Sequence, residues 1–172
     1  MKLSALAAAA NSNAPQPNHA VLIYGPAKTG KTRFVGTSAS IDEFDRIIWF
    51  DLENGSETLL HMGLSEKEMD KIDLIKIPDT RELPRGCETI LKAFSSKVDV
   101  AICVEHGKIA CVECTKDNKP ATVFNLRKLT HKDLVVIDSG SQLGDSALAL
   151  VCAGKPIEYK PQTDDWGTLG KY

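Results

Sequence analysis

The sequence predicts an α/β fold built on a mainly parallel sheet. Short apolar runs at 20–24, 46–51 and 133–138 have the composition of strands that are buried on both faces. Segments with a helical spacing of apolar residues lie between such runs, and this alternation is typical of β-α-β units with parallel strands. A glycine-rich loop follows the first run directly, and loops at the carboxyl ends of parallel strands commonly bind ligands.

Length and composition restrict the class of protein further. The chain has 172 residues, which suits one domain, and its hydrophobic fraction of 42% and charged fraction of 26% are those of a soluble globular protein. These values exclude a mainly disordered, collagen-like or coiled-coil protein. The net charge of -2 provides no global attraction for nucleic acid, so any such contact requires a local basic patch. No apolar run reaches the ~18–20 residues of a membrane span.

Residues 1–18 have the composition of a flexible N-terminal tail, and residues 19–172 contain the predicted domain. A stretch of small apolar residues from Leu3 to Ala10 follows a single charge at Lys2, which is an incomplete match to a signal peptide. The five cysteines are an odd number, and this does not suggest a secreted disulfide scaffold. We therefore expect a reducing, cytoplasmic setting and no membrane association.

Strands and helices alternate in the first part of the domain. The expected elements are a strand at 20–24, a helix at 32–38, a strand at 46–51, a helix at 59–71, a strand at 72–77 and a helix at 85–96. Turn-forming residues follow the second and third strands, at Asn54-Gly55 and at Pro78. A helical spacing of Ile90 and Phe94 supports the last helix.

Residues 99–130 interrupt this alternation and form a predicted insertion that contains three of the five cysteines. After the insertion, Asp133 to Asp138 is the clearest strand of the sequence. A plausible amphipathic helix at 141–152 and a loop at 154–165 complete the series.

An eight-residue loop after the first predicted strand matches the pattern G-x-x-x-x-G-K-[ST] at every fixed position. It consists of Gly25, Pro26, Ala27, Lys28, Thr29, Gly30, Lys31 and Thr32. Glycines let successive backbone N–H groups point at phosphate oxygens, and the helix that begins here adds its positive end. Lys31 is expected to contact the β- and γ-phosphates, and the hydroxyl of Thr32 to coordinate Mg²⁺. The loop therefore predicts binding of a nucleoside triphosphate, with ATP and Mg²⁺ as the expected cofactors.

Acidic residues occupy the carboxyl ends of two predicted strands. Asp138 ends the last strand, a position from which such sites hold Mg²⁺ or its water, although it can also simply accept a hydrogen bond there. Glu53 follows the second strand, where a carboxylate can polarise an attacking water as a general base. Asp51 is the competing candidate for this role, and either carboxylate can instead cap the turn at Asn54-Gly55.

Four segments occur in the order found in RecA-type recombinase ATPases. They are Gly25 to Thr32, Ile48 to Glu53, Ile77 to Thr80 and Val135 to Ser139. More closely, the chain resembles phage-encoded RecA-like ATPases linked to single-strand annealing and recombination. The more specific marks are Glu-Asn-Gly after the second strand, the His/Cys insertion, Asp-Ser-Gly-Ser-Gln-Leu and Asp-Asp-Trp-Gly. The resemblance extends over most of the chain, from Val21 to Tyr172.

The resemblance implies a RecA-like P-loop NTPase fold and a set of roles for named residues. Glu53 corresponds to the family's catalytic glutamate and Asp138 to its Mg²⁺-associated aspartate. Lys31 and Thr32 correspond to the phosphate and magnesium contacts. It also implies a homo-oligomer that acts on single-stranded DNA in recombination and repair, in the cytoplasm of a bacterial host.

The same resemblance implies that the C-terminal part of this core is missing. In this fold class a further strand follows the Asp138 strand and lies between it and the strand at 20–24. Here one helix, a loop and Trp166-Gly167 follow Asp138, and then the sequence ends. We expect an incomplete RecA-like core, either a fragment or one completed by a partner, that binds nucleotide yet hydrolyses it poorly alone.

The insertion contains the spacing C-x2-H-x4-C-x2-C, formed by Cys103, His106, Cys111 and Cys114. Two ligand pairs, each separated by two residues, suit tetrahedral zinc, and four such ligands leave no open position for catalysis. A structural zinc site would let a small insertion fold without a core of its own. Glu105 or Glu113 can replace one ligand, and a set of reduced thiols that bind no metal is the alternative.

The loop after the last helix carries two lysines and one aromatic residue, Lys155, Lys160 and Tyr159. Stacking and phosphate contacts from such residues can hold a single strand without sequence preference. The resemblance places this loop where the RecA-type fold has its first DNA-binding loop. A solvated linker is the alternative, because Glu158 and two aspartates dilute the positive charge.

Together these patterns predict a RecA-like protein that binds and hydrolyses ATP and acts on single-stranded DNA. A P-loop ATPase with a different kind of partner is the first alternative. The second is a module that binds nucleotide and zinc for assembly and does not hydrolyse ATP.

Overall fold

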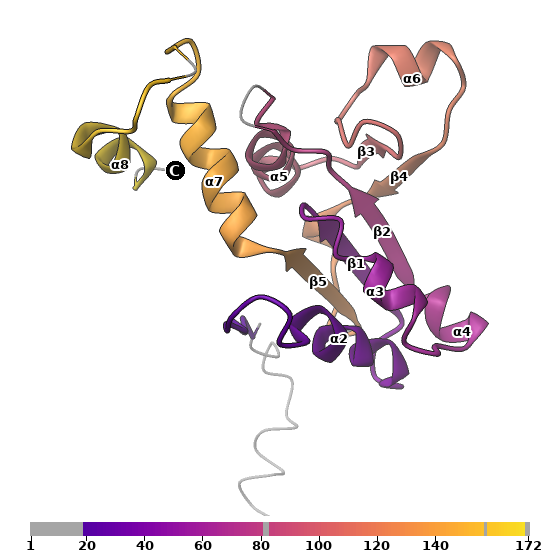
Figure 1. Ribbon diagram of the computed structural model, residues 1–172. Coiled ribbons are helices and arrows are strands. Elements are labelled where there is room, and N and C mark those ends of the chain that lie inside the picture. The colour runs from indigo at the N-terminus through magenta and orange to yellow at the C-terminus, as the bar shows by residue number, and fades with distance from the viewer. Residues whose placement is uncertain (1–18, 81–82, 157, 171–172) are drawn as a thin grey trace, which may run out of the picture.

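A parallel sheet of three strands forms the centre of the fold in the computed structural model, which describes residues 19–80, 83–156 and 158–170. The strands are β1 (Arg46–Asp51), β2 (Ile72–Lys76) and β5 (Asp133–Asp138). β1 lies in the middle and pairs in parallel with both neighbours (Figure 1). Asp51 is in register with Lys76 and with Asp138, so all three strands end at the same edge. The predicted α/β fold with parallel strands is confirmed, and the predicted tail at 1–18 lies outside the described residues.

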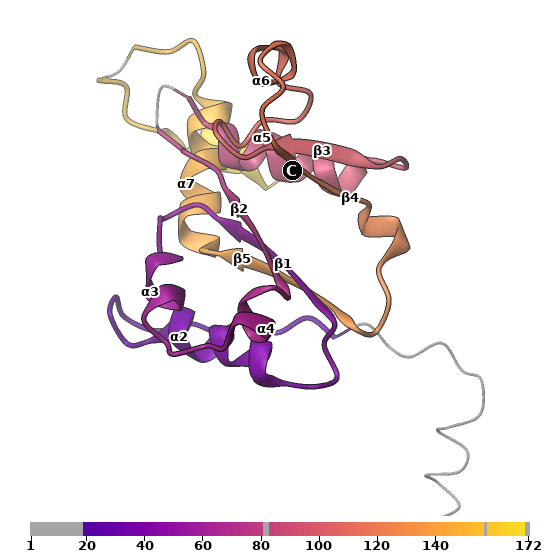
Figure 2. The same cartoon turned by 90° about the vertical axis from the view of Figure 1, so that its right-hand side faces the viewer.

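Helices and an inserted hairpin cover the two faces of this sheet. The helices are α2 (Lys31–Gly36), α3 (Glu57–Leu60), α4 (Glu66–Met69), α5 (Arg85–Ser95), α6 (Val112–Lys116), α7 (Gly140–Val151) and α8 (Thr163–Leu169), with 3-10 turns at Thr37–Ser40 and Leu126–Lys128. In Figure 2, α2, α3 and α4 lie on one side of the sheet, and α5 with the hairpin lies on the other. The helices predicted at 85–96 and 141–152 are confirmed as α5 and α7. Within the described residues, no helix has both the length and the apolarity needed to cross a membrane.

The four central residues of β1, at 47–50, are apolar because successive side chains point to two buried faces. Ile47 and Trp49 pack with residues of the α2–α3 side, and Ile48 and Phe50 pack with residues of α5 and the hairpin. All four side chains are 0% exposed. Burial of each such side chain contributes roughly 1.5–3 kcal/mol. The strand is therefore the common wall of two hydrophobic cores.

The insertion predicted at 99–130 forms an antiparallel hairpin. β3 (Val100–Cys103) pairs with β4 (Ala121–Phe124), and α6 lies in the connection between them. The ring of Phe124 packs edge-on against that of Phe50, with centroids 5.7 Å apart. The hairpin thus shares a core with the sheet through an aromatic contact.

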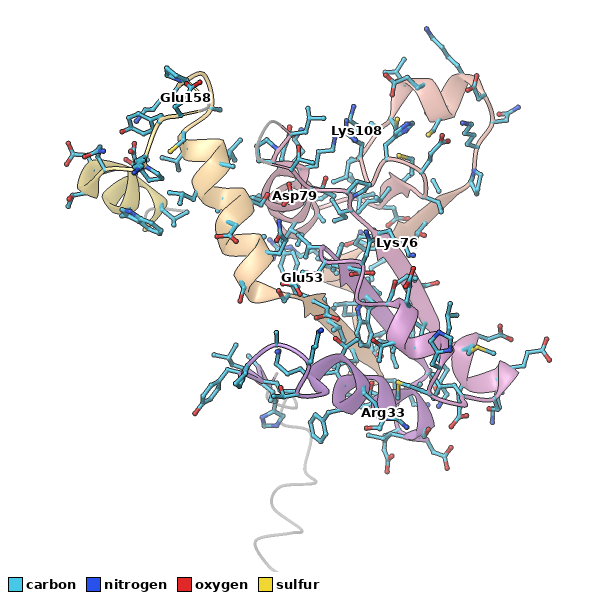
Figure 3. All side chains as sticks on the ribbon, in the orientation of Figure 1. Arg33, Glu53, Lys76, Asp79, Lys108 and Glu158 are labelled. Atoms are coloured by element: carbon cyan, nitrogen blue, oxygen red, sulfur yellow. The ribbon has the colours of Figure 1, made fainter. Side chains whose placement is uncertain are left out.

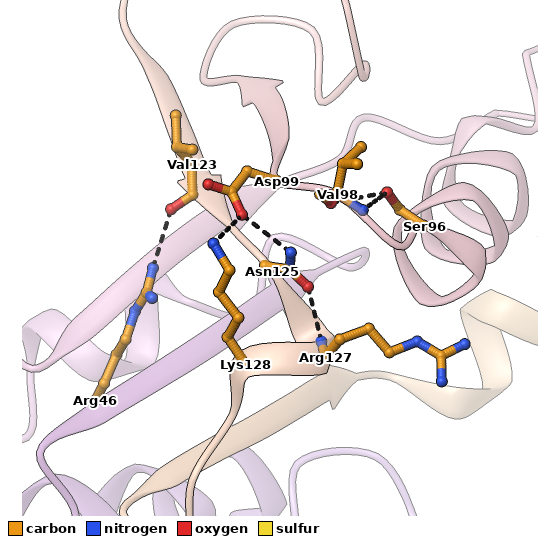
Figure 4. A network of polar contacts seen from close by, with 8 residues as sticks. All are labelled: Arg46, Ser96, Val98, Asp99, Val123, Asn125, Arg127 and Lys128. Carbon is orange, nitrogen blue, oxygen red and sulfur yellow. Dashed lines mark hydrogen bonds and ion pairs between the residues drawn. The ribbon is translucent and has the colours of Figure 1, made fainter.

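A polar network fixes the base of the hairpin (Figure 4). The carboxylate of Asp99 accepts hydrogen bonds from Asn125 at 3.0 Å and from Lys128 at 2.8 Å. From β1, the guanidinium of Arg46 donates to the carbonyl of Val123 at 3.3 Å. These contacts tie both ends of the insertion to the edge of the domain.

The prediction of a strand at 20–24 is wrong. These residues adopt no regular structure, and Val21, Leu22 and Tyr24 are 81%, 83% and 88% exposed. A strand buried on both faces needs a neighbour along its edge. In the part of the chain that the structure describes, β5 pairs only with β1, so no neighbouring strand covers this segment.

The single helix predicted at 59–71 is also wrong, because two short helices, α3 and α4, take its place. Gly63 between them has a φ of +73°, a left-handed conformation that ends helices. α4 then begins with a capping box, in which Ser65 and Glu68 each accept a hydrogen bond from the other's backbone N–H. The sequence contained this start signal at 65–68.

Candidate nucleotide and metal sites

The edge where the parallel strands end brings together the two residues predicted to hold Mg²⁺. The hydroxyl of Thr32 donates a hydrogen bond of 2.9 Å to Oδ2 of Asp138, although the two residues are 106 positions apart in the chain. Thr32 lies in the first turn of α2, and Asp138 is the last residue of β5. The loop at 25–32 that is predicted to bind phosphate is therefore joined to the predicted strand-end carboxylate.

Gly55 lies against this pair of residues. A Cβ atom at position 55 would lie 3.2 Å from Oδ2 of Asp138 and 3.5 Å from Oγ1 of Thr32. A side chain there would crowd both groups. The sequence pattern Asn54-Gly55 indicates only a turn. The close approach of Gly55 to Asp138 depends on the pairing of β1 with β5, which the pattern does not report.

The two carboxylates after β1 have different surroundings. Asp51 is 2% exposed, and its carboxylate accepts hydrogen bonds of 3.0–3.2 Å from three backbone N–H groups. The donors are Glu53, Gly55 and Ser56. Glu53 is exposed, and its carboxylate accepts a hydrogen bond from the hydroxyl of Ser139. Asp51 therefore holds the loop in shape, and Glu53 is the carboxylate that can reach a ligand.

Residues 25–30 of the loop predicted to bind phosphate are exposed, and two carbonyls of this loop bind the lysine predicted to contact phosphate. Nζ of Lys31 donates to the carbonyl oxygens of Gly25 at 3.0 Å and of Pro26 at 2.9 Å. Lys28 and Gly30 have φ values of 64° and 84°, so the loop is tightly curled. Hydrogen bonds between two charged groups are stronger than those to neutral carbonyls. A phosphate group would therefore compete well for the ammonium of Lys31.

Negative charge accumulates at this edge of the sheet. Burial raises the pKa of Asp138, and the carboxylates of Asp51 and Glu53 raise it further. The hydrogen bond from Thr32 and the charge of Lys31 act in the opposite direction. Added positive charge would stabilise three carboxylates in such proximity.

A cleft opens at the same edge beside Glu53. It has a volume of about 570 Å³, and Ile77, Asp79 and Gln142 are among its lining residues. A second cavity of about 330 Å³ shares Asp79 and Gln142 and continues along α7. Figure 3 labels Glu53 and Asp79, which come from the ends of β1 and β2. The phosphate loop lines neither cavity.

Asp79, after the end of β2, is a further acidic residue at this edge, and its sequence position predicted no role for it. Both of its carboxylate oxygens are buried, and neither has a hydrogen-bond partner among the described residues. The carboxylate faces the start of α5, since a Cβ at Gly86 would lie 2.8 Å from Oδ2. Negative charge is favourable at a helix N-terminus. The available signal was an acidic residue directly after an apolar strand and Pro78.

The four residues predicted to bind zinc meet in the hairpin. One donor atom from each of Cys103, His106, Cys111 and Cys114 lies within 4.8 Å of the others. Nδ1 of His106 is 3.2 Å from Sγ of Cys114 and 3.6 Å from Sγ of Cys111. Donor atoms of a tetrahedral zinc site are about 3.5–3.8 Å apart. The three cysteines are also buried, so this Cys3His group can hold a metal ion such as zinc.

The thiols of the group do not ionise equally. Burial, together with the neighbouring thiols of Cys111 and Cys103, raises the pKa of Cys114 to about 12. Burial also opposes ionisation of Cys103, but hydrogen bonds from the backbone N–H groups of Lys108 and His106 and from the neighbouring thiols together outweigh it and lower the pKa of Cys103. Ionisation of Cys103 is thus easier than that of Cys114, and a positive charge in the cluster would favour the thiolate form of both. A divalent metal supplies that charge.

The two carboxylates considered as replacement ligands lie around the group. Glu105 forms an ion pair with Lys119. Glu113 accepts a hydrogen bond from the thiol of Cys111 at 3.5 Å. The Cys3His set is therefore complete without either carboxylate.

The predicted DNA contacts Lys155 and Tyr159 interact with Asp165 in α8. Nζ of Lys155 lies 2.5 Å from Oδ1 of Asp165, and the hydroxyl of Tyr159 donates to Oδ2 at 2.6 Å. Asp165 also accepts from the backbone N–H of Gln162, which starts α8 inside the predicted loop. Lys160 is exposed. Asp165 thus binds Lys155 and Tyr159 directly, and does more than reduce the net positive charge of the loop.

No family model, no curated protein and no solved structure matches this chain. The interpretation of its function therefore depends on its motifs and on the geometry of these two sites.

Proposed function

We propose that this chain binds ATP with Mg²⁺ at the phosphate loop and hydrolyses it at the edge of the parallel sheet, as a RecA-like P-loop NTPase. The hydrogen bond between Thr32 and Asp138 carries this proposal, because it joins the phosphate loop to a strand-end carboxylate. Glu53 adds to it, since its partner Ser139 directly follows Asp138 in the chain. The proposed phosphate loop, the proposed Mg²⁺ ligands and the candidate base thus come from one edge of the sheet, which supports the proposal.

The proposed roles follow from the chemistry of each group. Lys31 would exchange its bonds to loop carbonyls for bonds to the β- and γ-phosphates. Thr32 and Asp138 offer oxygen donors, which Mg²⁺ prefers, and the raised pKa of Asp138 indicates a place where added positive charge is favourable. Glu53 would accept a proton from the attacking water. ATP supplies the phosphoanhydride bond that is cleaved.

We propose single-stranded DNA as the partner and assembly of several copies, since the resemblance to RecA-type ATPases implies both. Lys155, Tyr159 and Lys160 are the proposed DNA contacts. Binding through this loop requires the bonds of Lys155 and Tyr159 to Asp165 to open. That cost favours, as a second candidate, a P-loop ATPase that acts on a partner other than DNA.

Zinc is the metal that we propose for the Cys3His group. Thiolate and imidazole ligands suit zinc, and a closed set of four gives a structural centre with no open position. The cysteines that the structure describes are unpaired with one another as disulfides. A reducing cytoplasm is the compartment that keeps such thiols available to a metal.

Nucleotide binding and phosphate release test the proposal. The wild type is expected to bind a fluorescent ATP analogue with Mg²⁺, and Lys31→Ala to lose this binding. Lys67→Ala, which changes an exposed lysine of α4, is the matched control. Glu53→Gln is expected to keep binding and to reduce turnover by roughly 10²- to 10⁴-fold, because it removes the general base. Glu66→Gln, also in α4, should leave turnover unchanged.

The same assay with a single-stranded oligonucleotide distinguishes the partners. Stimulated turnover supports a DNA partner, and unstimulated turnover supports the second candidate. Nucleotide binding without any turnover would indicate an assembly module. A wild-type chain that loads its metal but binds no nucleotide contradicts the proposal.

A further inference from the structure

We propose that the metal-binding hairpin positions the wall of the cleft beside Glu53, and that Gly107 is the positioning residue through which it acts. The catalytic consequence of this contact rests on the proposed ATP hydrolysis at Glu53. The contact itself is a property of the fold and can be measured without ATP.

Gly107 lies directly on the backbone at the end of β2. It is buried and has a φ of +60°. A Cβ atom at this position would lie 2.7 Å from Cα of Ile77 and 2.7 Å from the carbonyl oxygen of Lys76. Backbone atoms cannot move aside as a flexible side chain can. Glycine is therefore required here both by the left-handed conformation and by the close approach.

Two hydrogen bonds fix Gly107 on its other sides. Its N–H donates to the carbonyl of Cys103, one of the metal-binding residues, at 3.0 Å. Its carbonyl accepts a hydrogen bond of 2.9 Å from the hydroxyl of Thr89, a residue of α5 that is 4% exposed. Gly107 thus connects the metal cluster, α5 and the end of β2.

Contacts continue from Ile77 to the proposed nucleotide edge, which is the end of the parallel sheet that carries Thr32, Glu53 and Asp138. The N–H of Ile77 donates to the carbonyl of Asp51 at 2.9 Å, and the carboxylate of Asp51 holds the N–H groups of Glu53 and Gly55. Ile77 and Glu53 also line the same cleft. In Figure 3, Lys76 and Lys108, which flank the Gly107 contact, are labelled at the end of β2 and in the hairpin. A continuous series of contacts, in which hydrogen bonds lie on both sides of the close approach of Gly107 to Ile77, therefore leads from the metal-binding residues to the candidate general base.

The segment at 104–120, which connects β3 to β4, depends on the Cys3His cluster to hold its conformation. Cys103, Cys111 and Cys114 form a buried cluster of their own, separate from the two main cores. The valines of this region, Val104 and Val112, are 50% and 64% exposed and add little to a core. A bound metal supplies the cohesion that apolar burial does not supply here. Metal binding is thereby linked to the placement of Gly107 on β2.

Gly107→Ala tests this proposal, and Gly63→Ala is its matched control. Gly63 has a φ of +73°, and no described atom lies within 4 Å of a Cβ built there, so this variant has the same backbone strain without the collision. Hydrogen exchange at 76–80, bound zinc, nucleotide affinity and single-turnover hydrolysis are measured on the full chain loaded with zinc.

Gly107→Ala is expected to retain zinc and nucleotide affinity, but to lose exchange protection at 76–80. Its hydrolysis rate should fall roughly 10- to 100-fold, because small displacements of catalytic groups have effects of that size. Gly63→Ala should match the wild type in both measurements. Thr89→Val removes the bond to the Gly107 carbonyl without a collision, and it should give a smaller loss of protection in the same segment. Removal of zinc from the wild type should also reduce protection at 76–80.

Equal exchange at 76–80 in Gly107→Ala and Gly63→Ala overturns the proposal, whether or not the wild type hydrolyses ATP. If Gly107→Ala does not fold, unchanged exchange in Thr89→Val overturns it instead. Altered exchange with an unchanged hydrolysis rate overturns the positioning role and leaves the proposed function intact. A wild type without hydrolysis, but with exchange that responds to Gly107→Ala, supports the contact and contradicts only the proposed function.

Discussion

The Cys3His cluster and the proposed nucleotide edge, the end of the parallel sheet that carries Thr32, Glu53 and Asp138, are assembled in opposite ways. All four residues of the cluster lie within the twelve positions from Cys103 to Cys114, and its three cysteines are buried. The nucleotide edge joins Thr32, Glu53 and Asp138 from separate elements, and its central hydrogen bond connects residues 106 positions apart. One site is local and shielded, and the other is long-range and open.

Each site therefore depends on a different part of the structure. The four residues of the cluster are brought together by a short hairpin, and a metal bound there would join them further, so loss of one ligand should disrupt it. The geometry of the edge is set by strand register and by Asp51, whose carboxylate holds three backbone N–H groups. Loss of the Asp51 carboxylate should therefore disrupt this edge of the sheet. Cys114→Ser and Asp51→Asn should each disrupt one site and leave the other, whereas Asp165→Asn and Lys128→Ala should leave both in place.

Cys114→Ser should have the largest effect, because it removes one of four ligands. We expect zinc affinity to fall by more than ~100-fold, since even groups outside the first coordination shell are worth 10- to 100-fold. Elemental analysis should show the loss of zinc, and hydrogen exchange should show a disordered connection at 104–120 with β1 still protected. Cys152→Ser, at a half-buried cysteine outside the group, is the control. Full zinc retention in Cys114→Ser would disprove the cluster.

Asp51→Asn should be the largest change at the nucleotide edge. The amide keeps one acceptor oxygen where the carboxylate bound three N–H groups, and hydrogen bonds to charged groups contribute about 1.5–3 kcal/mol each. We expect the free energy of unfolding to fall by roughly 3 kcal/mol in urea titrations, with bound zinc unchanged. Asp70→Asn, at an exposed site, provides the reference. A loss no greater than that of the reference would mean that Asp51 is not an anchor.

Asp165→Asn should release α8 and leave both sites in place. Hydrogen bonds from Lys155, Tyr159 and the backbone of Gln162 lower the pKa of Asp165 to about 2. Its carboxylate therefore stabilises the docked helix above the unfolded pKa of about 3.9, and this contribution disappears as the pH falls from there toward 2. Fluorescence of Trp166 should change over that range in the wild type and already differ at pH 7 in Asp165→Asn.

Asp164→Asn, which changes the exposed neighbour, is the control for this measurement. Identical emission of the wild type and Asp165→Asn at pH 7 would contradict a role of Asp165 in docking α8.

Lys128→Ala should have the smallest effect. The ion pair with Asp99 at the base of the hairpin is exposed, and pairs of this kind contribute at most about 1 kcal/mol. Unfolding in urea should shift by no more than that amount, and zinc content should not change. A loss of zinc on this substitution would show that surface charge, and not the ligand set, holds the hairpin together.

The cluster was predictable because its ligands are close in sequence, and the structure brings all four together as the spacing indicated. The sheet was predictable because β1, β2 and β5 are apolar runs with turn signals after them. Register was not predictable from composition, so the contact of Gly55 with Thr32 and Asp138 and that of Gly107 with Ile77 appeared only in three dimensions.

The errors have physical reasons as well. The run at 20–24 has the side chains of a buried strand, but a strand also requires a neighbour, and no sequence pattern within the run reports one. The helix at 59–71 was predicted from its polar and apolar positions, whereas Gly63 and the capping box at Ser65 divide it. Local backbone signals prevailed there over periodicity.

The central claim is that Thr32 and Asp138 form the metal-binding part of a nucleotide site. Calorimetric titration of ATP with and without Mg²⁺ tests it most directly, on the wild type, on Asp138→Asn and on the exposed control Asp145→Asn. We predict that Mg²⁺ strengthens binding by at least ~10-fold, or 1.4 kcal/mol, in the wild type and the control, and not in Asp138→Asn. Equal strengthening by Mg²⁺ in Asp138→Asn, or no binding of ATP by the wild type, would contradict the claim.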